Sequence, residues 1–171
     1  MNINDYLSEV KNIFDNFNEL LFDNQLPEAI LIIQNSGNKK GLLGWCSAKP
    51  SWQTKDGSEQ KYEITVTAEH LHRSIEDIAA TILHEMCHFN NALNGVVDCT
   101  GPGKIKFYHN KHFKKEAEER GLVVEKTVKN GWAYTYMGTK AKEAFDKINI
   151  DISAFDFARI QYDKPEKEQI S

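Results

Sequence analysis

Cysteine is scarce in this sequence of 171 residues, which contains three such residues. Cys46, Cys87 and Cys99 are widely separated, and none of them is part of a Cys-x-x-Cys pair. A disulfide framework needs an even number of cysteines, and a zinc ribbon needs them in close pairs. The sequence therefore excludes both scaffolds and indicates a reducing compartment, for which we expect a cytoplasmic location.

Long apolar runs and an excess of positive charge are also absent. No apolar stretch approaches the length of about 18 residues that suggests a membrane-spanning helix. The first residues are polar and acidic, unlike those of a signal peptide. We therefore expect a soluble, unexported protein with no membrane partner. Because the formal net charge is −4, the chain as a whole has no general attraction for nucleic acid.

The sequence does contain a His-Glu-x-x-His motif, formed by His84, Glu85 and His88. Histidines four positions apart lie on the same face of a helix, so both imidazoles can bind one zinc ion. Glu85 lies about 100° around the helix from His84, where its carboxylate reaches a water molecule better than the ion itself. The motif therefore predicts a metal site with Glu85 as the general base.

Two features predict that the motif lies on a helix. Ser74 is a suitable N-cap, and the acidic Asp77 follows three positions later. Apolar residues then repeat at steps of three and four, at Ile78, Ile82, Met86, Phe89 and Leu93. The histidines flank this stripe, so we expect the stripe to face the core and the histidines to face a cleft. The alternative is a chance motif in a metal-free helical protein.

A third metal ligand must come from another part of the chain. The extended motif His-Glu-x-x-His-x-x-Gly-x-x-His is excluded, because Asn91 and Asn94 occupy its last two positions. Other donors lie in a helix predicted from Phe107 to about Arg120, or in the loop before it: His109, His112, Glu116, Glu119, Asp98 and Cys99. The first three of these donors share one face of that helix, so periodicity does not choose between them.

The remaining segments predict an α+β fold. Helical periodicity covers residues 4–22 and 141–148. Short strands are predicted at 29–33, 42–46 and 62–66, which we expect to form a small meander, and again at 123–124 and 132–136. Apolar and polar residues alternate in the 62–66 strand, which predicts a single buried face. We expect one domain over residues 1–160 and a flexible charged tail over 161–171.

Several segments resemble the SprT-like metallopeptidases, a family that includes the Spartan proteases. They are the run Phe22-Asp23-Asn24-Gln25-Leu26-Pro27, Gly44-Trp45-Cys46 with Trp52 beyond it, Glu63-Ile64-Thr65-Val66, and the His84 to His88 motif. In that family the third zinc ligand opens a His-Gly-Pro-x-Phe element. The matching run here is His109-Asn110-Lys111-His112-Phe113, in which Asn and Lys replace Gly and Pro. The resemblance therefore implies His109 as the third ligand, with His112 as the alternative.

The resemblance also implies a fold and an activity. The fold would be zincin-like, with a small antiparallel or mixed sheet packed on an N-terminal helix and a metal-binding helix, followed by a second ligand-bearing helix. The activity would be that of a zinc-dependent endopeptidase, with Zn²⁺ held by His84, His88 and His109 and with Glu85 as the catalytic base. The alternative is a catalytically idle zinc-binding module that acts as an adaptor on nucleic acid or on a protein complex.

Protein substrates bound to DNA are a further expectation, because Spartan-type members act on such proteins. Many members carry a cysteine zinc ribbon after the peptidase domain, which this chain lacks. A local basic cluster lies near the predicted site, at Lys104, Lys106, Lys111, Lys114 and Lys115, and its stacking surfaces would be Phe107, Tyr108 and Trp132. The alternative is a solvated helix face balanced by glutamates. Candidate donors to the oxyanion of the reaction are Tyr108, Tyr134 and Tyr136.

Overall fold

The structure is a computed structural model that describes residues 2–37, 39, 41–100, 107–156 and 158–160. Its elements are, in chain order, α1 (Ile3–Phe22), β1 (Ile30–Gln34), β2 (Gly44–Cys46), β3 (Trp52–Gln53), β4 (Gln60–Lys61), β5 (Glu63–Thr67), the 3-10 helix η1 (Ala68–His70), α2 (Ile75–Leu93), α3 (Lys111–Glu119), β6 (Leu122–Thr127), β7 (Gly131–Met137), α4 (Thr139–Phe145) and the 3-10 helix η2 (Ile152–Phe155). The α+β class is confirmed. The predicted tail over 161–171 lies outside the described residues.

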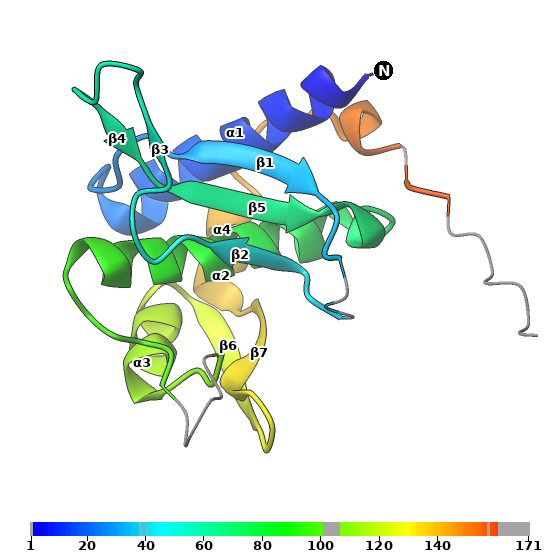
Figure 1. Ribbon diagram of the computed structural model, residues 1–171. Coiled ribbons are helices and arrows are strands. Elements are labelled where there is room, and N and C mark those ends of the chain that lie inside the picture. The colour runs from blue at the N-terminus through cyan, green and yellow to red at the C-terminus, as the bar shows by residue number, and fades with distance from the viewer. Residues whose placement is uncertain (1, 38, 40, 101–106, 157, 161–171) are drawn as a thin grey trace, which may run out of the picture.

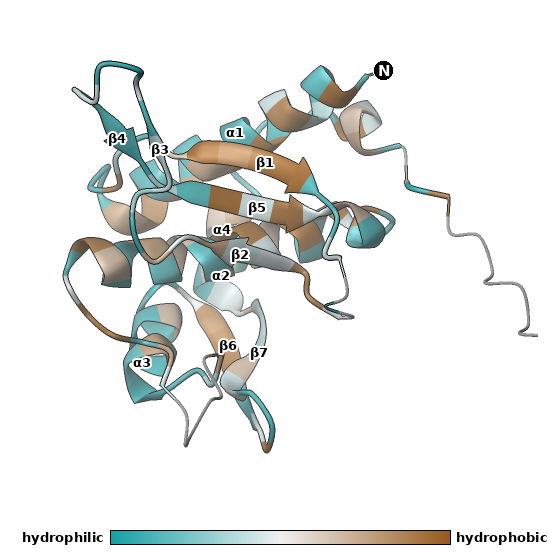
Figure 2. Cartoon of the chain, viewed as in Figure 1, coloured by the Kyte–Doolittle hydropathy of each residue, from teal (hydrophilic) through white to brown (hydrophobic). Residues whose placement is uncertain are grey.

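The three-stranded sheet has the order β1-β5-β2, as Figure 1 shows. Strand β5 runs parallel to β1 and antiparallel to β2, so the sheet is mixed. The predicted meander is therefore wrong, because β5 enters between the two earlier strands. The chain between β2 and β5 forms the small β3–β4 hairpin. In Figure 2 that hairpin is hydrophilic, whereas β1 is mostly apolar.

The central strand β5 is buried on both faces, although its alternating sequence predicted one buried face. Ile64 and Val66 pack into the hydrophobic core. Thr65 and Thr67 are also fully buried. The Thr65 hydroxyl donates a hydrogen bond to the Glu63 carboxylate at 2.8 Å, and the Thr67 hydroxyl donates one to the backbone carbonyl of Leu42 at 2.8 Å. A satisfied hydroxyl is tolerated inside a protein, so alternation of apolar residues with threonine did not signal solvent exposure.

Helix α2 lies at the centre of the fold. It packs against α1 and the sheet on one side, and against α3 and the β6–β7 hairpin on the other. Its stripe of Ile78, Ile82, Met86 and Phe89 is fully buried, as predicted, whereas Leu93 at its C-terminal end is exposed. Among the described residues, no helix is long and apolar enough to cross a membrane.

Helix α3 begins later than the sequence analysis predicted. Asn110 is its N-cap, and its side-chain oxygen accepts hydrogen bonds from the backbone N–H groups of His112 at 2.8 Å and Phe113 at 3.4 Å. Asparagine is among the preferred N-cap residues, so the helix starts at Lys111. The expectation of a second ligand-bearing helix is therefore wrong, because His109 lies before the helix in extended chain.

Candidate metal centre

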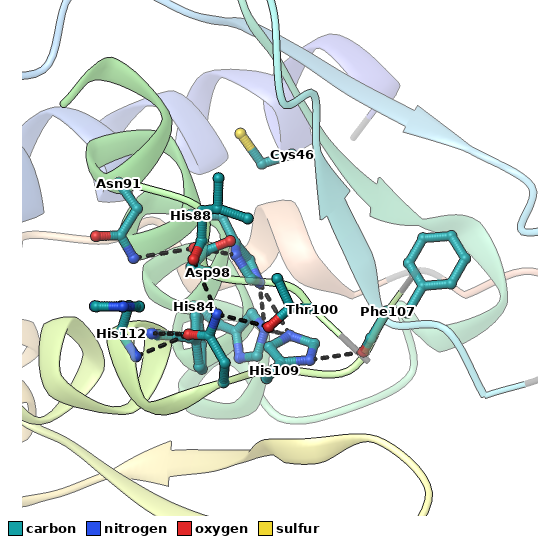
Figure 3. A network of polar contacts seen from close by, with 12 residues as sticks. Cys46, His84, His88, Asn91, Asp98, Thr100, Phe107, His109 and His112 are labelled. Atoms are coloured by element: carbon teal, nitrogen blue, oxygen red, sulfur yellow. Dashed lines mark hydrogen bonds and ion pairs between the residues drawn. The ribbon is translucent and has the colours of Figure 1, made fainter. Parts of the chain in front are cut away.

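Three histidine side chains from two distant parts of the chain meet beside α2. The Nε2 atom of His109 lies 3.1 Å from that of His84 and 3.0 Å from that of His88, and the last two lie 3.2 Å apart. Figure 3 shows the three rings pointing toward one another. The three residues form a group that could hold a metal ion.

The Nδ1 nitrogen of each ring already has a hydrogen-bonding partner. Each Nδ1 lies next to an oxygen, namely the Thr135 hydroxyl for His84 at 2.8 Å, the Asp98 carboxylate for His88 at 2.7 Å, and the Phe107 carbonyl for His109 at 3.0 Å. Carboxylate and carbonyl oxygens only accept hydrogen bonds, so Nδ1 carries the proton in the neutral rings of His88 and His109. Their Nε2 lone pairs then face each other at 3.0 Å, an arrangement that repels unless a cation lies between them.

Burial keeps two of these rings neutral. Desolvation lowers the pKa of His84 well below its usual value, and lowers the pKa of His109 to about 4, with repulsion from His88 as the second cause in both cases. Burial opposes protonation of His88 as well, but the Asp98 hydrogen bond and the negative charge of Glu85 raise its pKa overall. Neutral imidazole is the form that binds metals, so the site is prepared for an ion without first losing protons at His84 and His109.

Backbone pairing fixes His109 in place. His109 forms isolated β-bridges with Cys99 and with Gly131, and its carbonyl accepts a hydrogen bond from the backbone N–H of Trp132 at 3.0 Å. Gly131 has a φ of +66°, and a Cβ atom at this position would collide with the His109 carbonyl oxygen. A glycine is therefore required where the β7 strand passes this close to the ligand candidate.

The other donors considered from the sequence do not join the three rings. His112 is exposed and lies apart from them in Figure 3. Glu116 is buried but binds Asn90 at 2.8 Å and Arg120 at 2.7 Å. Asp98 and Cys99 form a second potential group with His88. In that group, however, the Asp98 carboxylate already accepts from His88 and, at 3.0 Å, from Asn91.

Glu85 lies next to the histidines, with its carboxylate enclosed between α2 and the edge strand β2. Only 5% of its surface is exposed, and this burial raises its pKa to about 7. The backbone N–H of Cys46 donates a hydrogen bond to the carboxylate. A Cβ atom on Gly44 would lie 2.7 Å from the Thr65 carbonyl oxygen and 3.3 Å from a Glu85 oxygen, so glycine lets β2 approach the helix closely. A carboxylate with a pKa near neutrality can both accept and return a proton.

A comparison with protein-family models identifies one family. The model described as the SprT-like family matches residues 10–152, which is most of the chain. The chain belongs to the SprT-like family. Searches of curated proteins and of solved structures returned no match. The resemblance noted in the sequence is therefore confirmed at the level of the family.

Two of the three candidate oxyanion donors of this SprT-like protein lie on the wrong face of β7. Thr135 turns its hydroxyl toward His84. Because side chains alternate along a strand, its neighbours Tyr134 and Tyr136 point to the opposite face, where 56% and 41% of their surfaces are exposed. Tyr136 donates instead to Glu125 at 3.1 Å. Tyr108, which lies beside Gly131, stays a prediction.

The partners of the Nδ1 atoms were not identified from the sequence. The sequence indicated Asp98 only as a candidate direct ligand and gave no sign of a role for Thr135. The signal for both is weak, because each partner comes from a segment at least ten positions away from its histidine and no periodicity connects them.

Replacing Asp98 with asparagine is expected to weaken metal binding of this SprT-like protein by roughly 10- to 100-fold, the range typical of partners that orient a ligand. The substitution removes the charge that favours the Nδ1–H form of His88 but keeps the shape of the side chain. Affinity should be measured by competition with a chromophoric chelator. Asp151→Asn, at the exposed N-cap of η2, is the matched control and should bind metal as the native protein does. Equal affinity of the two variants would show that Asp98 does not orient His88.

Proposed function

We propose that this SprT-like protein is a zinc-dependent endopeptidase. The observation that carries the proposal is the convergence of three imidazole Nε2 atoms, 3.0 to 3.2 Å apart, beside the buried carboxylate of Glu85. Zinc binds imidazole nitrogen at about 2.0–2.1 Å in a tetrahedral arrangement, which places neighbouring nitrogens about 3.3 Å apart. The three-nitrogen donor set and its spacing therefore fit zinc, with His84, His88 and His109 as the ligands.

The roles of the residues follow from their positions. When bound, zinc supplies a Lewis acid that polarises the scissile carbonyl and lowers the pKa of a water molecule. Glu85 accepts the proton of the attacking water and passes it to the leaving amine. The Cys46 N–H holds the Glu85 carboxylate against β2 during both transfers. Asp98 and Thr135 keep the imidazole rings of His88 and His84 in the orientation that ligation needs.

An enzyme explains Glu85 better than an idle zinc-binding adaptor does. A structural zinc site is closed by four protein ligands, whereas the converging group in the described part of the chain contains three. A structural site also has no use for a buried carboxylate beside the ion, and burying such a group costs free energy. The three-ligand group and the retained Glu85 both support catalysis.

Metal removal tests the proposal directly. Protein purified without added metal is expected to contain about one equivalent of zinc, since one tripod of ligands is present. It should cleave an unstructured protein substrate, lose this activity after dialysis against a chelator, and regain it when zinc is returned. Elemental analysis and gel-based cleavage assays measure the two quantities. Protein that is free of metal, or whose cleavage is unaffected by the chelator, would contradict the proposal.

Protein substrates associated with DNA remain a prediction. Lys104 and Lys106 of the predicted basic cluster lie outside the described residues. The Lys114 ammonium lies 4.4 Å from the centroid of the Trp132 ring, so it covers a ring face on which a base would stack, and it also pairs with Glu118 at 3.5 Å. This pairing favours the solvated helix face over a phosphate-binding surface. Cleavage of a DNA-binding protein, compared with and without DNA, tests the prediction: acceleration by DNA supports it, and equal rates contradict it.

A further inference from the structure

One buried phenylalanine contacts all three histidine rings. The centroid of the Phe113 ring lies 4.5 Å from that of His84, 4.4 Å from that of His88 and 4.6 Å from that of His109. The three histidine rings lie 4.8 to 5.1 Å from one another. The Phe113 ring is almost equally distant from the three imidazoles, and the imidazoles are almost equally spaced. The Phe113 ring therefore lies near the axis of the triangle that the imidazoles form.

The start of α3 puts the phenylalanine in this position. Asn110 follows His109 and caps the helix, and the backbone N–H of Phe113 is one of the two groups that the cap binds. The ring of Phe113 therefore enters the protein in the first turn of α3, directly behind the histidine that precedes the helix. None of the surface of Phe113 is exposed, so its ring closes the inner side of the triangle.

The three contacts differ in geometry, and two of them have the geometries that aromatic pairs prefer. The Phe113 ring is stacked on His88, with 27° between the planes, and meets His109 edge-on, with 83° between the planes. The angle to His84 is 45°. Stacked and edge-on aromatic pairs have preferred geometries, so rotation of His88 or His109 would break a favourable contact, while the His84 ring is in close contact at a tilt. The ring also keeps water from the inner side of the site.

We propose that Phe113 is a positioning residue of the metal centre, whose ring holds the three imidazoles in the arrangement that binds the ion and restricts access to the ion to the outer side. This inference rests on the proposed function in one respect, which is that the three histidines bind zinc. A core residue with a merely structural role would affect stability alone. Phe113 would affect the affinity for the metal and its coordination geometry as well.

The test compares Phe113→Leu with Phe89→Leu. Phe89 is the matched control because it is equally buried and lies on α2 next to His88, but its ring packs on Tyr62, with 4.9 Å between centroids. Three measurements are made on each variant: thermal unfolding without metal, zinc affinity by chelator competition, and the visible absorption spectrum of the Co²⁺-substituted protein. Phe113→Met, which keeps an apolar side chain of similar size, replaces the leucine variant if that variant does not fold.

Both leucine variants are expected to unfold at lower temperature than the native protein. Only Phe113→Leu should bind zinc about 10-fold or more weakly and show a shifted Co²⁺ spectrum, as expected when the surroundings of the ligands change. Native affinity and a native spectrum in Phe113→Leu, or equal losses in Phe89→Leu, would overturn the inference. Native protein that binds no zinc would instead overturn the proposed function, so the two failures are distinguishable.

Discussion

Replacing Glu85 with glutamine is expected to leave the metal in place and to lower kcat by roughly 10²- to 10⁴-fold, the usual contribution of a positioned general base. Glutamine has the shape of glutamate but cannot accept a proton at neutral pH. The three histidines and their Nδ1 partners are unchanged by this substitution. The variant should therefore be isolated with native zinc content and little cleavage, as measured by elemental analysis and by initial rates on the same unstructured substrate.

Glu116→Gln is the matched control for this experiment. Glu116 is also a buried glutamate, with 8% of its surface exposed, and it binds Arg120 at the C-cap of α3 rather than facing the histidine triangle. Its replacement should destabilise the fold, because Arg120 loses a charged partner, while the cleavage rate of folded protein stays close to native. If Glu85→Gln kept full activity, the protein would not use Glu85 as its base. Native protein that holds zinc but cleaves nothing would instead make the idle adaptor the better description of the site.

The parts of the site that could be predicted from the sequence are those encoded over short distances. Histidines four positions apart in an apolar helical repeat predicted a helix with both imidazoles on one side, and α2 has this form. Ser74, the predicted N-cap, accepts the backbone N–H of Asp77 at 3.1 Å. Each of these predictions depends on residues within a few positions of one another, where helix geometry alone determines which side chains are neighbours.

The parts that could not be predicted depend on long-range pairing. Asp98 and Thr135 become partners of His88 and His84 only because the loop after α2 and the strand β7 fold back on that helix. The position of β5 between β1 and β2 likewise depends on which strand is most completely buried, which short-range alternation does not report. The start of α3 differs from these cases, because it could have been predicted from a nearby residue. Asn110 is a preferred N-cap residue, but the helical periodicity of residues 107–120 placed the start of the helix before it.

Replacing His109 with alanine is expected to reduce zinc affinity by more than the roughly 100-fold seen when a residue that only orients a ligand is lost. The substitution removes one of three converging nitrogens, and His84 and His88 alone would hold the ion with two. His112→Ala is the matched control, because His112 is exposed and lies only three positions away. It should bind zinc and cleave substrate as the native protein does, since its ring is not part of the converging group.

The pair of variants also tests how the ligand is presented. His109 is held in extended chain by its bridges to Cys99 and Gly131, so the ligand position does not depend on the helical turn that contains His112. Exogenous imidazole should partly restore zinc binding to His109→Ala, because the substitution leaves a space bounded by Phe113 and the Phe107 carbonyl. The opposite result would be that His112→Ala loses zinc and His109→Ala retains it. That result would require α3 to begin one turn earlier, and it would contradict the N-cap at Asn110, on which the geometry of the site depends.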